Sequence, residues 1–566
     1  MHAALIRKFR PRGTLIYGNI SQLFYKQDPS FSHGETIVTA TTDTFTDQDS
    51  IVRSALPAQV RMQGFRVVRN FAVNSENISA GGGWTLSNST VTSGISAPDG
   101  TNTAFTLTAT AAIGQVYRFH TAASTGLLNS FWVRRRTGAG LVQLVKADTG
   151  NEAIATNTTW QRFSGTITSA VGGTTGYIGV ICTTNGDSVD IWHPQQEDVV
   201  GQVNQNPAEY VSNGVLPPPY QGLGVDGIKA FSTLNGNTVA SNLVTEATGA
   251  LISASIRQGL LAEPAATQLV TPLASVRDMT NAAWVLGATM TRARNQVGMD
   301  GVANTATLLT GGATLATNTI LQTLTAAASP RTYSVGLKLV SGTIEITQDG
   351  TAWTNITSLL NTATFTVVPI TASILNASFG IRASISGSAV ADWNQFQAGA
   401  TFTSRIPEAL AAINADVVAR TLGGEFNPNF GTLFVDFIQP VDDGTQKVAL
   451  ALDAGTANNN SINIYSANGT TRCIVWGGAS PNLHYSIPSP AAGTRVRIAF
   501  AFAINDGAAF QNGVAMTLNN AGSTLPTVTT FNVGNNASVL QLSSTIAEAT
   551  YFPSRLPNAN VQALSV

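Results

Sequence analysis

The residue types that carry out most enzyme chemistry are sparse and scattered in this sequence. None of its five histidines sits in a His-Glu-x-x-His pattern or in another close spacing typical of metal ligands. The sequence contains no Gly-x-Ser-x-Gly elbow, no phosphate-binding loop and no dinucleotide-binding glycine pattern. We therefore predict no catalytic residues, no metal site and no cofactor. The histidines are His2, His33, His120, His193 and His484.

The acidic residues also provide no clear catalytic pair. Glycosidases need two carboxyl groups held about 5–10 Å apart. The adjacent pairs Glu197/Asp198 and Asp442/Asp443 do not fit, because neighbouring residues on a strand point to opposite faces. The sequence predicts that the protein is not an enzyme. An acid pair assembled from distant strands is the alternative that stays open.

Tryptophans could stack on sugar rings, since an exposed indole presents an apolar face. Four of them recur at matched places in the chain, which favours a structural role in a core over contact with a ligand: Trp84, Trp192, Trp284 and Trp393. The other aromatic residues are better candidates for glycan contact. We select Trp132, Trp353, Trp476 and Tyr485.

A basic cluster without neighbouring acids opens the chain: Arg7, Lys8, Arg10 and Arg12. One interpretation is a solvated tail. The other is electrostatic docking onto an acidic protein surface. A second basic run, Arg134-Arg135-Arg136, is expected to be a solvated face or a guard on an edge strand.

Asp99 and Asp300 each precede a glycine, which is typical of a plain turn. Structural calcium, bound by carboxylate and carbonyl oxygens, is the alternative for both. No acidic cluster surrounds either aspartate, so we favour the turn.

Composition excludes several classes of protein. The 566 residues include 30 Lys+Arg and 31 Asp+Glu, and only 11% are charged. This near-neutral balance argues against nucleic-acid binding, which needs a concentrated positive surface. No apolar stretch is long enough to insert into a membrane as a helix. The two cysteines, Cys182 and Cys473, lie too far apart for a disulfide framework and are expected to be buried thiols.

Strand signals dominate the elements that must position these residues. Polar and apolar residues alternate in 103–110, 162–168, 341–347 and 461–465, as half-buried antiparallel strands require. Asp-Gly and Asn-Gly pairs separate such segments. A helical pattern is present only near 408–414. We predict an all-β chain of tandem β-sandwich or jelly-roll domains with an extended N-terminal segment.

An internal repeat organises the chain. Trp84-Thr-Leu86 recurs as Trp284-Val-Leu286, and Ile191-Trp192 matches Asp392-Trp393, at an offset of about 200 residues. A period this long indicates two copies of a whole domain. The predicted parts are an N-terminal segment (1–65), a first jelly roll (66–211), a Pro/Gly-rich linker with short strands (212–262), a second jelly roll (263–407), a connector (408–425) and a different β-sandwich (426–566).

The repeat also carries a resemblance. Trp84, Asp99-Gly100, Trp192 and Gln196, with their counterparts Trp284, Asp300-Gly301, Trp393 and Gln397, resemble the carbohydrate-binding-module-like jelly rolls of tailed-bacteriophage fibre and spike proteins. The block from Gly431 is similar to concanavalin/laminin-G-type sandwiches. The resemblance covers residues 66–555.

This resemblance implies a structural fibre or spike of a virion, on the head or tail, that attaches to host-surface glycans. Residues 1–65 would then join the chain to a capsid, connector or tail protein, and the chain would associate with itself as a homotrimer. Two alternatives are a capsid-decorating protein without a receptor role and a polysaccharide depolymerase with targeting sandwiches.

Overall fold

The computed structural model is almost entirely β-structure. It describes residues 23–26, 36–38, 43–55, 61–121, 124–146, 150–170, 175–215, 226–231, 234–236, 259–424, 426–478, 480–522 and 524–566. About 51% of the chain is strand and 4% is helix, which confirms the all-β prediction. Among these residues no helix is long and apolar enough to cross a membrane.

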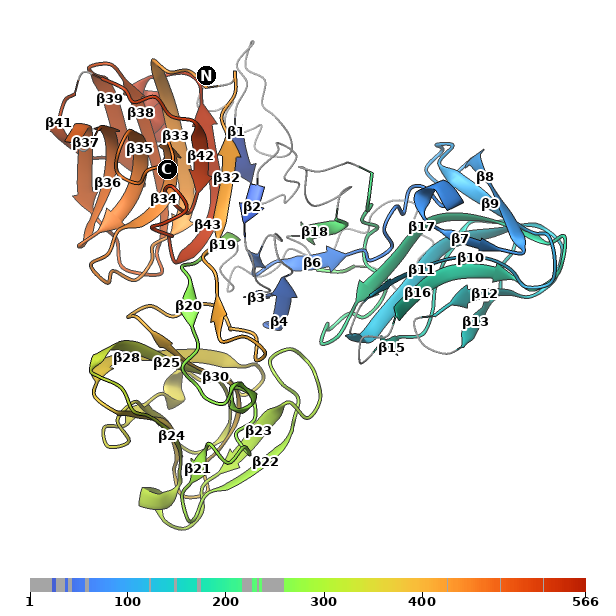
Figure 1. The fold of residues 1–566 in the computed structure, drawn as a ribbon, viewed down its shortest axis with the longest axis horizontal. Helices are drawn as coiled ribbons and strands as arrows, with labels where there is room; N and C mark the ends of the chain where they lie inside the picture. Colours follow the sequence, from blue (N-terminus) through green and yellow to red (C-terminus); the bar gives the residue numbers. More distant parts are fainter. Residues whose placement is uncertain are drawn as a thin grey trace. The chain divides into compact units, whose positions relative to one another are not determined.

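The chain forms two compact units. One contains Phe65–Ser253, and the other contains Glu35–Gly64 and Ala254–Val566. The first unit holds one sandwich and the second unit holds two; we call them the first, second and third sandwich in chain order (Figure 1). The basic cluster predicted for docking, at 7–12, lies outside the described residues.

The first sandwich consists of two antiparallel sheets. The five-stranded sheet has the spatial order β13 (Asn151–Ile154), β12 (Val142–Val145), β16 (Thr175–Cys182), β10 (Gly114–Thr121), β7 (Thr85–Ser87). The six-stranded sheet has the order β14 (Gln161–Ser164), β11 (Ser124–Thr137), β17 (Ser188–Asp198), β9 (Ala104–Ala109), β8 (Ser89–Ile95), with β15 (Thr168–Ala170) also paired to β11. The strand β6 (Arg66–Arg69) pairs with β18 (Ile228–Phe231) in the same unit.

The second sandwich repeats this topology except for β15, which has no separate counterpart. Its sheets have the orders β27 (Thr354–Asn355), β26 (Ile344–Thr347), β29 (Ala377–Ala383), β24 (Thr319–Leu324), β21 (Val285–Leu286) and β22 (Thr291–Gln296), β23 (Ala306–Thr310), β30 (Ser388–Ala398), β25 (Ser329–Ser341), β28 (Thr366–Ile374). The other strands occupy corresponding places in the two copies, so the chain contains the same sandwich twice.

The sequence analysis matched Trp192 with Trp393. The strand register of the two copies shifts this match by one residue. In both copies the register of the central strand pair shifts at the same point, as at a β-bulge. The residues with a positive φ there are His193 (49°) and Trp393 (53°). Trp393 is therefore the counterpart of His193, and Trp192 is the counterpart of Asp392.

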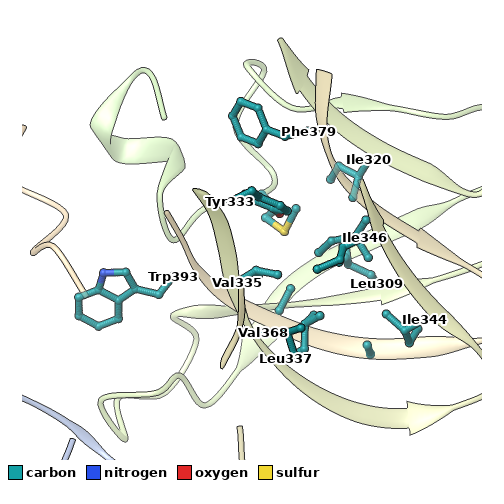
Figure 2. Close-up of a cluster of buried hydrophobic side chains, with 14 of the residues drawn as sticks. Leu309, Ile320, Tyr333, Val335, Leu337, Ile344, Ile346, Val368, Phe379 and Trp393 are labelled. Carbon is teal, nitrogen blue, oxygen red and sulfur yellow. The ribbon is translucent and has the colours of Figure 1, made fainter. Parts of the chain in front are cut away.

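Buried aromatic rings fill the space between the sheets of each copy. Trp84 contacts Phe131 edge-on, and Trp284 contacts Phe379 in the same way. Each indole N–H donates to a backbone carbonyl, of Asn74 in the first copy and of Ser275 in the second. The second core is shown in Figure 2, where Tyr333, Phe379 and the aliphatic residues converge. All four repeated tryptophans are buried, but only three lie in the main cores, because Trp192 belongs to a separate cluster with Trp132.

The third sandwich has two eight-stranded sheets. One has the order β40 (Val514–Ala515), β39 (Asp506–Gln511), β38 (Arg495–Ala503), β33 (Phe430–Ile438), β43 (Ser544–Phe552), β19 (Gly259–Ala262), β5 (Met62–Gln63), with β1 (Leu23–Lys26) also on β43. The other has the order β2 (Thr36–Val38), β32 (Val417–Thr421), β42 (Thr530–Val533), β34 (Lys447–Asp453), β35 (Ser461–Ala467), β36 (Thr470–Gly477), β37 (Ser480–Pro488), β41 (Thr517–Asn520). Helix α2 (Asn558–Leu564) packs on β38 and β39.

The third sandwich recruits segments that the sequence assigns elsewhere. Strands from the N-terminal segment (β1, β2, β5), from the linker (β19) and from the connector (β32) all pair within its sheets. The third sandwich therefore includes strands from before residue 426, where the sequence analysis places its start.

The helix predicted near 408–414 is wrong. The chain there makes a turn and then the short strand β31 (Ala412–Ile413), which pairs with β20 (Ala266–Thr267). A helix of seven residues is marginal in water, and burial of Ile413 beside Ile406 and Ala266 favours the strand. The remaining elements within the described residues are the hairpin β3 (Asp43–Thr46)–β4 (Val52–Ala55) and four short 3-10 helices at Ala80–Gly82, Leu273–Ser275, Leu315–Thr317 and Thr357–Leu359.

Candidate ligand-binding surface

Three aromatic rings gather on the outer face of the five-stranded sheet of the first sandwich. Along β10, Val116 faces the core while Tyr117 and Phe119 face outward, because successive side chains alternate. On the neighbouring strand β16, Tyr177 lies directly opposite Phe119. The Tyr177 ring centroid is 6.2 Å from that of Tyr117 and 6.4 Å from that of Phe119. Phe119 is 59% exposed and Tyr177 is 37% exposed.

The backbone beneath these rings requires glycine. Gly179 lies opposite Tyr117 in the register, and a Cβ at this position would collide with the Val116 carbonyl oxygen and the Tyr117 Cβ. The next pair of positions along the sheet carries neutral amides, with Gln115 and Gln143 on either side of Ile181. We call Tyr117, Phe119 and Tyr177, with these two glutamines, the aromatic face.

The second sandwich lacks this surface although it has the same strands. The register makes Leu321 the counterpart of Tyr117, Thr323 that of Phe119, and Ser378 that of Tyr177. Gly380 takes the place of Gly179, and a Cβ there would also collide with a backbone carbonyl. The backbone requirement is therefore shared by the two copies, while the aromatic side chains belong to the first alone.

Two of the four aromatic residues selected from the sequence are covered. Trp132 is 3% exposed, with its ring centroid 6.3 Å from that of the buried Trp192. Tyr485 is 7% exposed and faces Phe500 of the opposite sheet at 6.1 Å. Neither ring offers a face to a ligand, because alternation placed each on a side of its sheet that other residues cover.

The other two are half-buried. Trp353 has the Arg382 guanidinium carbon 4.6 Å from its ring centroid, and Arg382 in turn pairs with Glu345 at 2.7 Å. One face of that indole is therefore occupied by a cation. Trp476 packs against a small apolar cluster that includes Tyr465. The structure does not bring the four selected residues together.

The aromatic face was missed from the sequence, although a signal was present. The run Val116-Tyr117-Arg118-Phe119 alternates in the period of a strand, and Tyr177-Ile178-Gly179 does so again. Only the register shows that these two runs are adjacent and that their aromatic residues share one face.

The arginine run at 134–136 is ion-paired rather than merely solvated. Arg134 and Arg136 both reach Asp190, at 2.8 and 3.2 Å, while Arg135 points to the other face and lies 3.2 Å from Asp187. Their strand, β11, pairs with β17 along this run, whereas its pairing with β14 ends at Val133. The expectation of an edge guard stays a prediction.

The aspartates of the two Asp-Gly turns are hydrogen-bonded within the protein. Asp99 accepts hydrogen bonds from the backbone and the hydroxyl of Thr101, at 2.9 and 2.7 Å. Asp300 is bound by both terminal nitrogens of Arg277, at 2.5 and 2.9 Å. Across the part of the chain that the structure describes, no group of three or more His, Cys, Asp or Glu could hold a metal ion.

Carboxylates of the two acidic pairs considered in the sequence analysis form hydrogen bonds or ion pairs within the fold. Glu197 is buried and accepts hydrogen bonds from the Gln195 amide at 2.8 Å and the Ala208 backbone at 3.0 Å. Asp198 accepts from the Val200 backbone at 3.0 Å. Asp443 pairs with Lys447 at 3.0 Å.

Of the two histidines whose side chains the structure describes, His193 has the more strongly lowered pKa. Its ring stacks between Trp192 and Tyr210, with centroid distances of 3.3 and 3.6 Å. Burial, aided by the charge of Arg162, lowers the pKa of His193 to about 2. A general base works best with a pKa near the operating pH, so this imidazole is suited to packing rather than to proton transfer at neutral pH.

Comparisons with known proteins add a few distant likenesses. No protein-family model matches the chain, and no curated protein matches its sequence. A carbohydrate-binding module (CBM40) of a Ruminococcus gnavus sialidase, bound to α2,3-sialyllactose, is 14% identical, with 25% of this chain and 83% of that one covered and a TM-score of 0.19. Domains LG4-5 of the mouse laminin α1 chain are 9% identical, with 40% and 83% covered and a TM-score of 0.17.

A larger enzyme is similar to the same degree. A Trypanosoma rangeli sialidase is 9% identical, with 93% of each chain covered and a TM-score of 0.21. Scores at this level decide neither the family nor the function. The assignment of this chain as tandem β-sandwiches rests on its own strand order.

Proposed function

We propose that the chain binds glycans through the aromatic face and is not an enzyme. The observation that supports this most is the exposure of Phe119 and Tyr177 beside Tyr117 on a regular sheet. Contiguous exposed apolar groups on a soluble protein usually mark an interaction site. Aromatic rings with neutral amides beside them suit a ligand with apolar ring faces and many hydroxyl groups, which describes a saccharide.

The second sandwich supplies the matched control for this proposal. We would replace Tyr117, Phe119 and Tyr177 with alanine in one variant and their counterparts Leu321, Thr323 and Ser378 in another. Against a glycan array and then by calorimetry, the first variant should lose at least tenfold in affinity and the second should keep it. Equal binding by the two variants would overturn the proposal.

We propose further that the chain is a fibre or spike of a bacteriophage virion, attached to the head or tail. Support comes from the resemblance of the repeated motifs, from the tandem sandwiches and from the low content of charge. Residues 1–65 would contact another virion protein through Arg7, Lys8, Arg10 and Arg12, and the assembled molecule would be a homotrimer. Linked copies would gain avidity for a repetitive host surface.

Two measurements test the proposed homotrimer and its attachment to the virion. Light scattering should give a mass three times that of the 58.9 kDa chain. Particles made with serine at the four basic positions should carry less of the chain than wild-type particles, as seen with a labelled antibody. A monomeric mass would contradict the homotrimer. Full incorporation of the serine variant into particles would contradict docking through the four basic residues.

The rival functions have their own signatures. A depolymerase would release reducing ends from host capsule, whereas we expect none. A decoration protein without a receptor role would leave adsorption unchanged in the aromatic-face variant while its removal lowered particle stability.

A further inference from the structure

The hairpin β3–β4 is bonded to both the second and the third sandwich. Among the described strands, β3 and β4 pair only with each other. An isolated two-stranded hairpin is at best marginally stable in water, so this one depends on its contacts with the two sandwiches. On the second sandwich, Val52 belongs to the buried core and its backbone N–H donates to the Met299 carbonyl at 2.7 Å. On the third, the Thr46 backbone N–H donates to the Gln63 amide oxygen of β5 at 3.0 Å.

The first strand of the hairpin also enters a buried cluster of charged residues. The Thr44 hydroxyl donates to the Arg405 carbonyl, and the Thr44 carbonyl accepts from the Arg61 guanidinium at 3.1 Å. The same guanidinium donates to Glu263 at 2.9 Å and pairs with Asp416. All members of this cluster are buried, and we call it the joint cluster: Asp43, Arg61, Glu263 and Asp416.

The joint cluster contains three carboxyl groups but one guanidinium. Arg61 is bonded to Glu263 and Asp416, whereas neither oxygen of Asp43 has a hydrogen bond within the described part of the chain. Asp43 is also only 1% exposed, so water does not compensate it. With all three acids ionised, the cluster would hold excess negative charge away from solvent, which is costly. The cluster is therefore most stable with a proton on one acid.

The other charged groups near the hairpin have partners of their own. The Arg405 guanidinium donates to a backbone carbonyl and to a hydroxyl of the second sandwich, at 3.1 and 2.9 Å. Within the hairpin, Arg53 pairs with Asp47 at 2.7 Å, and on the second sandwich Arg277 pairs with Asp392 at 2.9 Å. These groups do not supply the cation that an ionised Asp43 would need.

Asp43 is the acid best placed to hold the proton. Burial raises the pKa of Asp43 from 3.8 to about 7, opposed by the charge of Arg61 and aided by those of Asp416 and Glu263. In an open hairpin the carboxyl is hydrated and ionises near its ordinary value. Because the closed hairpin keeps a proton that the open hairpin releases, opening becomes easier as the pH rises towards 7.

We propose that the hairpin β3–β4 is a pH-dependent strap, which holds the second sandwich to the third while Asp43 is protonated and detaches when Asp43 releases its proton to water. The strap opens as a local unit, without unfolding of either sandwich, as weakly held segments of proteins do. It involves no glycan and is independent of the proposed function.

The first test is amide hydrogen exchange of the full chain at pH 5 and pH 8, with each rate divided by that of an unstructured peptide at the same pH. We expect the protection of the β3–β4 amides to fall at least tenfold at pH 8. At pH 8 it should also lie well below that of the β35 and β36 amides in the third sandwich. An unchanged protection of the hairpin, or one equal to that of β35 and β36, would refute the strap.

Two variants identify the acid. Asp43→Asn cannot ionise and should remove most of the fall in protection between pH 5 and pH 8. Asp99→Asn makes the same change of charge in an exposed turn of the first sandwich and should keep the wild-type fall. If Asp43→Asn retains the full fall, Asp43 does not operate the strap.

A distance measurement tests what the strap holds and needs only the wild-type acid. Spin labels are attached through Val285→Cys on the second sandwich and Val514→Cys on the third, at side chains that are 66% and 58% exposed. We expect the distribution of distances between the labels to be broader at pH 8 than at pH 5. The same distribution at both values would show that the hairpin does not hold the two sandwiches together, even if Asp43→Asn fails to fold.

Discussion

The guanidinium of Arg61 donates a hydrogen bond of 2.9 Å to the carboxylate of Glu263, a residue 202 positions further along the chain. The same side chain donates to the Ser404 hydroxyl at 2.6 Å and pairs with Asp416. Glu263 precedes the second sandwich, Ser404 follows it, and Asp416 leads into the third. The buried Arg61 therefore links the three segments that connect the second and third sandwiches.

We expect Arg61→Met to lower the stability of the second unit strongly. Removing one partner of a buried ion pair leaves uncompensated charge and typically costs ~3–5 kcal/mol. The measurement is the denaturant midpoint of the full chain. Arg294→Met is the control, since Arg294 pairs with Asp278 near the surface at 3.2 Å and such pairs are worth about 0–1 kcal/mol. Equal shifts for the two variants would show that the buried pairs contribute no more than surface ones.

Stability should fall as pH rises from about 4 to 7. Asp43 is 1% exposed beside Arg61, and neither of its oxygens makes a hydrogen bond within the described part of the chain. Burial, opposed by the charge of Arg61, raises its pKa to about 7, and burial also raises the pKa of Asp416 to about 6. The folded state keeps protons that the unfolded state releases in this range, so deprotonation destabilises the fold.

The variant Asp43→Asn separates this carboxyl from the others. It should raise the melting temperature at pH 8 and flatten the decline between pH 4 and 7, because an amide needs no proton to stay neutral. For Asp43 the upper bound on the effect, from 3.8 to about 7 at 1.36 kcal/mol per pH unit, is ~4 kcal/mol. An unchanged pH profile in the variant would mean that Asp43 does not titrate in this window.

Substitution of the two equivalent glycines should separate folding from binding. Gly179→Ala and Gly380→Ala both place a Cβ against a backbone carbonyl, and overpacking of this kind costs about 1–3 kcal/mol. Both should lower the melting temperature, but only Gly179→Ala should also weaken glycan binding, because it displaces Tyr117. Gly424→Ala, with nothing within 4 Å of the added Cβ, is the control for an alanine in open space.

Glycan binding at the aromatic face should depend little on salt. The side chains that form it are neutral, and screening at 0.5 M NaCl weakens interactions between charges but not contacts between apolar surfaces. Affinity measured at 50 and 500 mM NaCl should agree within about twofold. A steep loss with salt would point to an ionic ligand bound through arginines instead.

Local patterns in the sequence were enough to identify strands and the duplicated domain. The alternation at 341–347 became β26 (Ile344–Thr347), and that at 461–465 became β35. These predictions succeed because the period of two depends only on neighbouring residues. The pairing of Trp192 with Trp393 failed by one position because the sequence comparison matched identical residue types, whereas the strand register aligns Trp192 with Asp392.

Placement of the site needed information that no local pattern contains. Trp132 and Phe119 both lie on strands and both face away from the core between the sheets, yet Trp132 is covered by its neighbours and Phe119 is exposed. The difference arises from which segments fold over each sheet. The strands β19 and β32 were likewise assigned to a linker and a connector, because their partners lie far away in the sequence.

The pairing of β1, β5 and β43 within one sheet has a consequence for biosynthesis. A ribosome releases β1 hundreds of residues before its partner β43, and β5 well before its partner β19, so both strands stay unpaired while the segments in between are made. A sandwich formed mostly by the later segments is thus completed by strands that are made much earlier. Truncation at either terminus should leave unpaired edges in the same sheet, and a chain halted midway would expose them to aggregation.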